Sequence, residues 1–247
     1  MNGRKICALF SALLLAMPMT GCEKGEKSVE RPVPTYDANS KVIALTFDDG
    51  PNATTTNEIL DILEENGVVA SFFLIGNNIT EETESTVKRA YDLGCEINNH
   101  SQTHSYMNQM EAEDIAAEIG DTNAKIEAIT GETAHFFRPP YIAVNDTMWE
   151  TIELPFIAGY GVNDYMDSVT ADARYQGVMD QADDGVIILL HDAQGNSRTV
   201  EAVKRLVPDL LAEGYTFVTV SQLLDAKGIA PQSRIIYSYA AQTTMYG

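Results

Sequence analysis

The composition of the chain describes an acidic protein with enough apolar residues for one ordinary domain. It has 247 residues, 45% of them hydrophobic, and its 36 acidic and 16 basic side chains give a formal charge of -20. This length and apolar fraction fit a single α/β barrel or doubly wound domain. Because a field of this sign repels phosphate, the charge argues against nucleic acid as a partner and favours a neutral or cationic substrate.

The N-terminal segment is expected to serve export and anchoring. Arg4 and Lys5 precede an apolar stretch, and small residues then lead to Cys22. This order is typical of a bacterial lipoprotein signal, so residues 1–21 would be removed, Cys22 would carry the lipid and residues 22–40 would form a polar linker. A plain signal peptide or a short membrane anchor is the alternative, although the stretch is short for a membrane span. We therefore expect an extracytoplasmic domain held at a bacterial membrane only through its lipid.

From residue 41 onward, apolar segments alternate with amphipathic ones in the order expected of repeated βα units. The expected strands cover residues 42–47, 70–75, 95–98, 136–137, 156–158, 186–190 and 216–220. The expected helices cover residues 54–65, 81–93, 111–129 and 199–213. Seven strands with intervening helices predict a parallel barrel, complete or incomplete, with an open parallel sheet as the alternative.

We expect one domain over residues 41–230, followed by a C-terminal tail over residues 231–247. The tail contains three tyrosines and could be a docking strand, a segment that stacks on sugars, or a disordered end. Cys95 is expected to be a small buried residue of the core.

Ionisable residues follow several of the expected strands directly. Asp48, Asp49 and Gly50 follow the first strand, and His100 and His104 follow the third. Because the carboxyl ends of parallel strands meet at one rim of a barrel, these side chains are expected to converge. Adjacent acids at a strand exit point in different directions, so one can bind a cation while the other accepts a proton. Taken alone, the motif could also be a solvated turn.

Two imidazoles and one carboxylate make the smallest set for a catalytic zinc ion. His100 and His104 are four positions apart, a spacing that brings both rings to one face in a helical turn. With Asp49 they would leave one coordination position open for water. His191 follows a later strand and is the remaining well-placed general acid. His135 precedes a strand and is therefore assigned to the opposite rim.

Arg138 begins a loop stiffened by two prolines, Pro139 and Pro140, at another strand exit. Its guanidinium could hold a carboxylate by charge-assisted hydrogen bonds. The alternative is a rigid turn with an arginine on the surface.

Together these residues resemble the five ordered motifs of the polysaccharide deacetylases, carbohydrate esterase family 4, also called the NodB homology domain. The motifs are Thr46-Phe47-Asp48-Asp49-Gly50-Pro51, His100-Ser101-Gln102-Thr103-His104, Arg138-Pro139-Pro140-Tyr141, Asn163-Asp164-Tyr165 and Leu189-Leu190-His191-Asp192. The resemblance covers roughly residues 41–224. It implies a distorted (β/α)7 barrel in a single domain, which agrees with the strand count.

The resemblance implies a role for each residue on the metal side of the site. Asp49, His100 and His104 would hold a divalent metal, zinc or cobalt. Asp48 would be the general base that deprotonates the attacking water, and the backbone N–H of Tyr141 would stabilise the oxyanion.

On the acid side, the resemblance implies that His191 protonates the leaving group. Arg138 would orient the base, and Asp164 would tune His191. Because Tyr165 stands where most members of the family have tryptophan, Asp167 is an alternative to Asp164. The pocket for the acetyl methyl group would be shaped by Leu189, Tyr165 and Pro140.

The substrate expected from the resemblance is an acetylated polysaccharide or oligosaccharide. Residues 136–174 look more like the clostridial acetylxylan esterases than like the peptidoglycan or chitin branches of the family. The preferred prediction is therefore removal of O-acetyl groups from xylan by a monomeric enzyme. The alternative is N-deacetylation of N-acetylglucosamine in peptidoglycan or chitin oligomers. A third hypothesis is a catalytically silent lipoprotein that binds glycan at the cell surface.

Overall fold

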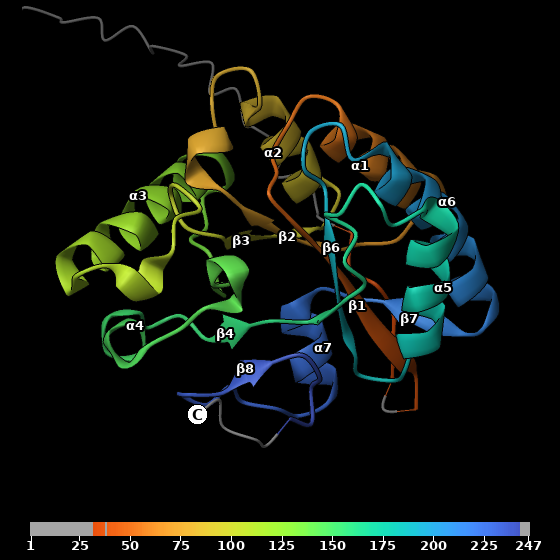
Figure 1. Ribbon diagram of the computed structural model, residues 1–247. Helices are drawn as coiled ribbons and strands as arrows, with labels where there is room; N and C mark the ends of the chain where they lie inside the picture. Colours follow the sequence, from red (N-terminus) through yellow and green to blue (C-terminus); the bar gives the residue numbers. More distant parts are fainter. Residues whose placement is uncertain (1–31, 38, 243–247) are drawn as a thin grey trace, which may run out of the picture. The chain divides into compact units, whose positions relative to one another are not determined.

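The computed structural model describes residues 32–37 and 39–242, in which strands and helices alternate (Figure 1). Its strands are β1 Lys41–Asp48, β2 Ser71–Leu74, β3 Glu96–Asn99, β4 Phe156–Ile157, β5 Tyr160–Gly161, β6 Ile187–His191, β7 Tyr215–Phe217 and β8 Ile236–Tyr237. Its α-helices are α1 Thr55–Asn66, α2 Glu84–Asp92, α3 Ala112–Thr130, α4 Asp146–Thr151, α5 Ala171–Gln181, α6 Ser197–Ala212 and α7 Val220–Ala226. Three 3-10 helices are η1 Gly76–Asn78, η2 Met107–Gln109 and η3 Pro140–Ile142.

The parallel sheet is centred on β1. Its strand order is β3-β2-β1-β6-β5, and β7 also pairs with β1. In the register of β1 with β6, Asp48 lies opposite His191, so both strands deliver an ionisable residue at the same edge. A separate parallel pair joins β4 to β8.

Single bridges connect the two sheets into a distorted barrel. Phe137 bridges to Asn99 at the end of β3 and to Phe156 at the start of β4. Val186, just before β6, bridges to Tyr239, just after β8. The strands therefore continue around from β1 through β3, β4 and β8 to β6, and the predicted barrel is confirmed.

Alternate residues of β1 face two different hydrophobic cores. The larger core lies under α1 and α6 and takes Ile43, Leu45 and Phe47. The smaller core lies on the other side of the strand and includes Val42 and Ala44. Because side chains alternate along a strand, Thr46 and Asp48 face the same side as Val42 and Ala44. Asp48, the last residue of β1, thus lies on the side of the strand that faces the smaller core.

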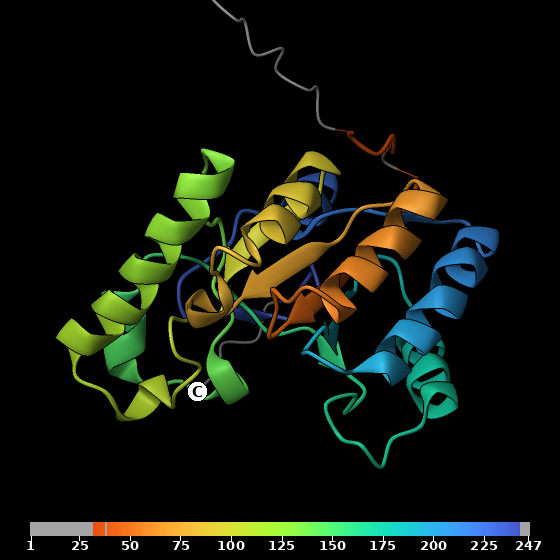
Figure 2. The same cartoon turned by 90° about the horizontal axis from the view of Figure 1, so that it is seen from above.

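The helices α3, α2, α1 and α6 lie in this order along the outside of the strands, and α5 packs against α6 (Figure 2). Gly67 ends α1 with φ 63°, and Gly131 ends α3 with φ 78°. These left-handed positions favour glycine, and both helix ends are the predicted ones. Cys95 is buried in the larger core, as expected.

Several expected elements differ from the observed ones. Residues 136–137 form no regular strand because the prolines that follow Arg138 lack the N–H groups that a ladder requires. The strand expected at residues 216–220 ends at Phe217, since Thr219 caps α7 in a capping box with Gln222. The helix expected at residues 81–93 begins only at Glu84. The elements α4, α5, α7, β5 and β8 were not predicted.

The packed chain continues past residue 230, where the predicted domain ended. Ile235, Ile236 and Tyr237 are buried, and β8 pairs with β4. Tyr239 donates a hydrogen bond from its hydroxyl to the backbone oxygen of Asp184, at 2.7 Å. Among the roles considered for the tail, the described part adopts that of a docking strand.

The expected signal segment, with Cys22, lies outside the described residues, as do residues 243–247. Within residues 32–37 and 39–242, no helix is both long enough and apolar enough to cross a bilayer.

Candidate active site

A buried ion pair lies at the exit of β1. Asp48 is 2% exposed, and its Oδ1 accepts a hydrogen bond from Nη1 of the fully buried Arg138. Arg138 also donates to Oγ1 of Thr46 at 2.8 Å, and its guanidinium lies 4.0 Å from the ring centroid of Phe73. Burial raises the pKa of Asp48, although the charge of Arg138 opposes this. Arg138 therefore holds a carboxylate of raised basicity in one position, as predicted.

Asp49, His100 and His104 converge beside this ion pair. One ligand atom from each residue lies within 4.8 Å of the others. Nε2 of His100 is 3.7 Å, and Nε2 of His104 is 3.5 Å, from Oδ1 of Asp49. The predicted set of two imidazoles and one carboxylate is thus brought together at the rim.

The environment of His100 keeps its ring neutral and fixes its tautomer. Its Nδ1 lies 2.7 Å from the backbone oxygen of Arg138. Because a carbonyl oxygen only accepts, Nδ1 carries the proton, and the lone pair of Nε2 faces Asp49. Burial, with a contribution from His104, lowers the pKa of His100 to about 3. Neutral imidazole is the form that binds metal ions.

An irregular turn, not the helical turn expected from the spacing, brings the two imidazoles together. Ser101 and His104 have φ 67° and 59°, in the left-handed region. The backbone N–H of Ser101 donates to Oδ1 of Asn99 at 2.8 Å, and that of His104 donates to Oγ of Ser101 at 2.9 Å. These side-chain acceptors compete with helical hydrogen bonds, which accounts for the wrong prediction. The ring centroids are 4.9 Å apart.

The oxygen Oδ1 of Asp49 has the properties of a metal ligand. It is buried and accepts no hydrogen bond from any described residue. Leaving such a group unsatisfied costs free energy that a bound cation would offset. Two imidazole nitrogens and one carboxylate oxygen suit a divalent transition metal and leave a position open. The residues present therefore fit a metal ion.

His191 ends β6 and is held by Asp164. Its Nδ1 lies 2.7 Å from Oδ1 of Asp164, and its backbone N–H donates to Oδ2 at 2.8 Å. Burial alone would lower the pKa of His191, but the hydrogen bond and charge of Asp164, with Asp48 and Asp49, raise it to about 9. The imidazolium therefore persists at neutral pH. Asp167 is fully exposed and pairs with Arg198 at 3.6 Å, so Asp164 is the partner of His191.

These groups open into a cavity of about 400 Å³. It is lined by Asp48, Asp49, His100, His104, Pro139, Tyr141, Ile142, Tyr165, Leu189 and His191. Tyr165 is 64% exposed, and its ring centroid lies 5.6 Å from that of His191. The expectation for Pro140 was wrong, because it begins η3 and is buried while Pro139 lines the cavity.

An aromatic pair borders the cavity on the side of His104. The rings of Tyr106 and Tyr141 stack with centroids 4.0 Å apart, and both side chains are exposed. The hydroxyl of Tyr141 donates to the backbone oxygen of His104 at 3.2 Å. Tyr141 itself has φ 60°, in the left-handed region, and lines the cavity. Sequence reasoning missed Tyr106, whose signal was an aromatic residue two positions after His104.

Comparison with known proteins places this site in a family. Residues 35–154 match the family model described as polysaccharide deacetylase. The chain is 49% identical over 197 residues to a bifunctional xylanase/deacetylase of Pseudobutyrivibrio xylanivorans, covering 80% of this chain and 33% of that protein. It is 38% identical to the solved family 4 acetyl xylan esterase of Clostridium thermocellum in complex with a cobalt ion. That match has a TM-score of 0.79 and covers 82% of this chain and 100% of the other. The chain belongs to the polysaccharide deacetylase family.

A third relative comes from another branch of the polysaccharide deacetylases. The chain is 37% identical over 195 residues to the peptidoglycan-N-acetylmuramic acid deacetylase PdaC of Bacillus subtilis, covering 78% of this chain and 41% of that protein. It therefore spans only a third to two fifths of the xylanase/deacetylase and of PdaC.

Asp192 is a site residue of this polysaccharide deacetylase to which sequence reasoning gave no role. It is fully buried and accepts hydrogen bonds from the backbone N–H of Gly50, at 3.0 Å, and from the hydroxyl of Thr56. A Cβ on Gly50 would lie 2.4 Å from its Oδ2, so a larger residue there would displace this carboxylate. Burial, with Asp49 and Asp48, raises its pKa to about 7. Its signal was an acid directly after His191.

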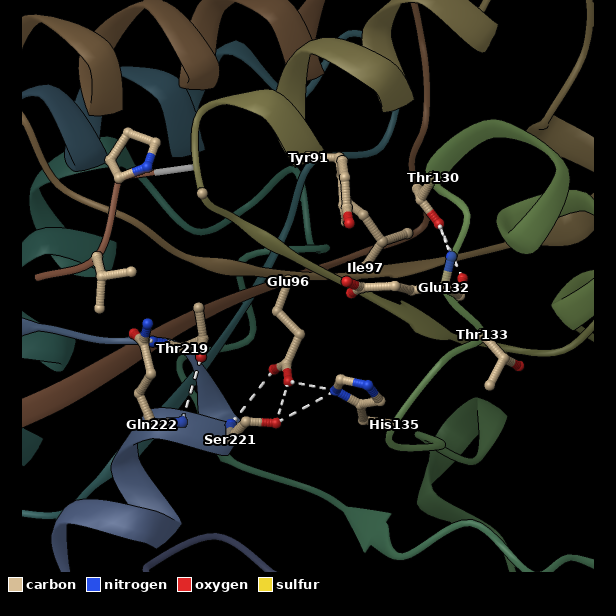
Figure 3. Close-up of a pocket in the computed structure, with 13 residues that line it drawn as sticks. Tyr91, Glu96, Ile97, Thr130, Glu132, Thr133, His135, Thr219, Ser221 and Gln222 are labelled. Carbon is tan, nitrogen blue, oxygen red and sulfur yellow. Dashed lines mark hydrogen bonds and ion pairs between the residues drawn. The ribbon is translucent and has the colours of Figure 1, made fainter. Parts of the chain in front are cut away.

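His135 lies away from the cavity, as predicted. Figure 3 shows it beside Glu96 and Ser221 in a separate pocket. Its Nδ1 is 3.4 Å from Oε1 of Glu96, which is the first residue of β3 and so marks the strand-entrance end of the barrel.

Proposed function

We propose that this protein hydrolyses acetyl groups from a polysaccharide, with the O-acetyl groups of xylan as its substrate and zinc or cobalt as its metal. The observation that carries the proposal is the meeting of three devices in one cavity of about 400 Å³. These are a metal-ligand set, a basic carboxylate held by a buried arginine, and an imidazolium held by a second carboxylate. Together they supply the parts of an acetyl hydrolase.

A named side chain accepts or donates each proton that moves in the reaction. A divalent cation held by Asp49, His100 and His104 would polarise the acetyl carbonyl and acidify the attacking water. Asp48 accepts the proton of this water as its oxygen bonds to the acetyl carbon. The imidazolium of His191 then gives its proton to the sugar oxygen as the bond between carbon and that oxygen breaks. The products are acetate and a free sugar hydroxyl.

Two further residues assist without exchanging protons. Asp164 faces Nδ1 of His191, so it stabilises the imidazolium and leaves Nε2 to donate. Tyr141 lines the cavity, and its peptide N–H would supply a donor for the oxyanion.

Three observations support xylan. A relative 49% identical along 80% of this chain is described as a xylanase/deacetylase, and a solved structure 38% identical along 82% of it is described as an acetyl xylan esterase. The formal charge of -20 favours a neutral glycan over an anionic polymer. Two exposed tyrosines, Tyr141 and Tyr165, line the cavity, and Tyr106 stacks on Tyr141. Aromatic rings offer flat apolar surface to sugar rings.

N-deacetylation of N-acetylglucosamine is the second candidate because PdaC, which matches this domain, is described as a deacetylase of another N-acetylated sugar of peptidoglycan, N-acetylmuramic acid. The same groups would serve an amide, with His191 protonating an amine.

A parallel assay separates the candidates. Acetate release would be measured from acetylated xylan, acetylated chitooligosaccharides and peptidoglycan, with zinc, with cobalt and with a chelator. We expect metal-dependent release that is fastest from xylan. Activity confined to the amide substrates would overturn the substrate assignment, and no metal-dependent release from any of them would overturn the proposed function.

We further propose that the protein works as a monomer, because every site residue comes from one chain. Light scattering of the purified domain should give the mass of one chain, and a stable dimer would contradict this.

For localisation, we propose an extracytoplasmic lipoprotein anchored to a bacterial membrane at Cys22. The support is the order of basic residues, apolar stretch and cysteine in residues 1–22. Mass spectrometry of the mature N-terminus should show an acylated Cys22, and Cys22→Ala should release the protein from membranes. An unmodified, uncleaved N-terminus would contradict it.

A further inference from the structure

Arg174, on α5, is a buried cation outside the cavity. It is 1% exposed, and among the described residues no carboxylate lies within ion-pairing distance of it. It donates to the backbone oxygens of Val169 and Met166, each at 3.0 Å. It also donates to Oγ1 of Thr199, at 2.9 Å, and to Oδ1 of Asn196. Burying a charge is costly, and every described hydrogen-bond partner of Arg174 is neutral. The reason for this arrangement lies in the parts of the site that these hydrogen bonds hold in place.

The first consequence of Arg174 concerns the hydroxyl of Thr199. A guanidinium can only donate, so Oγ1 of Thr199 must accept from Arg174. The single hydroxyl proton is then directed to Oδ2 of Asp164, which lies 2.7 Å away. Arg174 thereby fixes the direction of a hydrogen bond to the carboxylate that holds His191.

The second consequence concerns the amide of Asn196. Since Oδ1 of Asn196 accepts from Arg174, its Nδ2 must point the other way. Nδ2 donates to the backbone oxygens of His191, at 2.9 Å, and of Asp164, at 3.2 Å. The side chain of Asn196 thus joins the backbones of His191 and Asp164, the pair that forms the general acid.

The third consequence concerns the loop after Asp164. Met166 and Val169, whose carbonyl oxygens accept from Arg174, flank the exposed Asp167 and Ser168 of this loop. Asn163, at its start, has φ 54°. Without Arg174 the two carbonyl groups would be left without this donor, and the loop would lose the hydrogen bonds that the Arg174 side chain makes to it.

We propose that Arg174 is a positioning residue that holds Asp164 against Nδ1 of His191, through Thr199, through Asn196 and through the loop backbone. Its effect on turnover rests on the proposed function, in which His191 is the general acid. Its effect on the geometry of the pair formed by His191 and Asp164 does not depend on that function.

The groups that face His191 define what a change at Arg174 leaves intact. Asp164 bonds its Nδ1, and Asp48 and Asp49 act on it through their charge. The ring of Tyr165 packs edge-on against it. Arg174 contacts none of these side chains directly, but its charge acts on Asp164. Loss of this charge alone would raise the pKa of His191, so a lowered pKa on replacement must come through the hydrogen-bond partners of Arg174.

The test replaces Arg174 and one of its hydrogen-bond partners, Thr199, in separate variants. Arg174→Met removes all its donors, and Thr199→Val removes one hydroxyl while leaving Arg174 in place. Arg174→Lys keeps a charged donor and should restore part of the loss. Arg205→Met is the matched control, because Arg205 carries the same charge on neighbouring α6 but is exposed and pairs with Asp172.

The readouts are an NMR titration of His191, kcat and KM on acetylated xylan, and metal content. His191 is assigned among the four histidines of the chain with His191→Gln. In Arg174→Met, we expect His191 to deprotonate at lower pH than in the wild type, and kcat to fall about tenfold with KM and metal content little changed. Thr199→Val should shift both in the same direction by less, and Arg205→Met should shift neither.

The outcomes separate cleanly. A folded Arg174→Met protein with the titration and kcat of the wild type would overturn the proposal. If Arg174→Met does not fold, Thr199→Val decides, and an unchanged His191 titration there would overturn it. If the wild type releases no acetate, the proposed function fails, while the titrations still test whether Arg174 positions Asp164.

Discussion

The two ends of the barrel carry similar side chains in different electrostatic states. At the strand-entrance end, Glu96 lies in a pocket beside His135 (Figure 3). Its carboxylate accepts hydrogen bonds from Ser71, at 2.8 Å, from Asn98, at 3.2 Å, and from Ser221. Burial alone would raise the pKa of Glu96, but these partners and His135 lower it overall. Both oxygens of this carboxylate accept hydrogen bonds, so it ties β2, β3 and α7 together.

At the strand-exit end, one buried carboxylate oxygen receives no hydrogen bond from the described part of the chain. Oδ1 of Asp49 is buried with no hydrogen-bond partner among the described residues. The pKa of Asp48 is raised by burial despite its arginine, and the pKa of His100 is lowered to about 3. Hydrogen bonding therefore makes the cluster of Glu96 and His135 structural. The cluster at the strand-exit end is left able to bind a cation, through Asp49, and to accept a proton, through Asp48. The contrast predicts that substitutions at the strand-exit end reduce activity, whereas substitutions at the strand-entrance end reduce stability.

The largest expected effect is that of Asp48→Asn. The amide keeps the shape of the side chain but cannot accept a proton, so kcat should fall by about 10³-fold. Metal content, measured by mass spectrometry, should stay that of the wild type, because Asp48 is outside the ligand set. A variant retaining a tenth or more of the activity would refute the base assignment.

Replacing one histidine at each end should separate them next. His104→Gln removes a ligand from the Asp49 cluster, so metal affinity should fall by at least about a hundredfold. His135→Gln, the matched control at the other end, should leave metal affinity and activity unchanged. Both are measured by metal titration after dialysis. Equal metal loss in the two variants would remove the distinction between the ends.

Asp164→Asn should change how activity depends on pH. Because the pKa of His191 is raised to about 9, the acid form is present at neutral pH and is lost as the pH rises through that value. The substitution removes the main cause of the increase, so the alkaline limb should move to lower pH, with kcat reduced about thirtyfold at neutral pH. An unmoved alkaline limb would show that another group supplies the proton.

Glu96→Gln should affect stability and not turnover. Loss of charge-assisted hydrogen bonds to a buried carboxylate should lower the free energy of unfolding by about 2 kcal/mol, measured in urea at pH 7. Since its folded pKa is below the unfolded value of about 4.3, its contribution is present above that value and is lost as the pH falls. The difference from wild type should therefore shrink below about pH 4. A kcat loss in the folded variant would contradict the assignment of this end as structural.

The sequence was sufficient for the parts of the site that depend on local pattern. Asp48 and His191 follow unbroken apolar strands, so their position at a common rim follows from strand direction and alternation. Asp49 and the histidine pair could be grouped because their types and order match a metal site. His135 could be set apart because it comes before a strand.

The remaining features depend on contacts between segments distant in sequence. Arg174 and Thr199 lie on two helices, and nothing near either of them indicates that they contact each other or that Thr199 contacts Asp164. The turn that joins His100 to His104 is set by the side chain of Asn99, which the spacing does not reveal. β8 has two residues, too few for a periodic signal, yet it completes the barrel.

The most direct test is a metal titration of the chelated protein, followed by acetate release from acetylated xylan. The account predicts no release without metal, and activity that rises with added zinc or cobalt until one ion is bound per chain. In Asp49→Asn, the same titration should give little binding and little activity. Full activity in the metal-free protein, or metal binding unaffected by Asp49→Asn, would contradict the assignment of this cluster as the catalytic metal site.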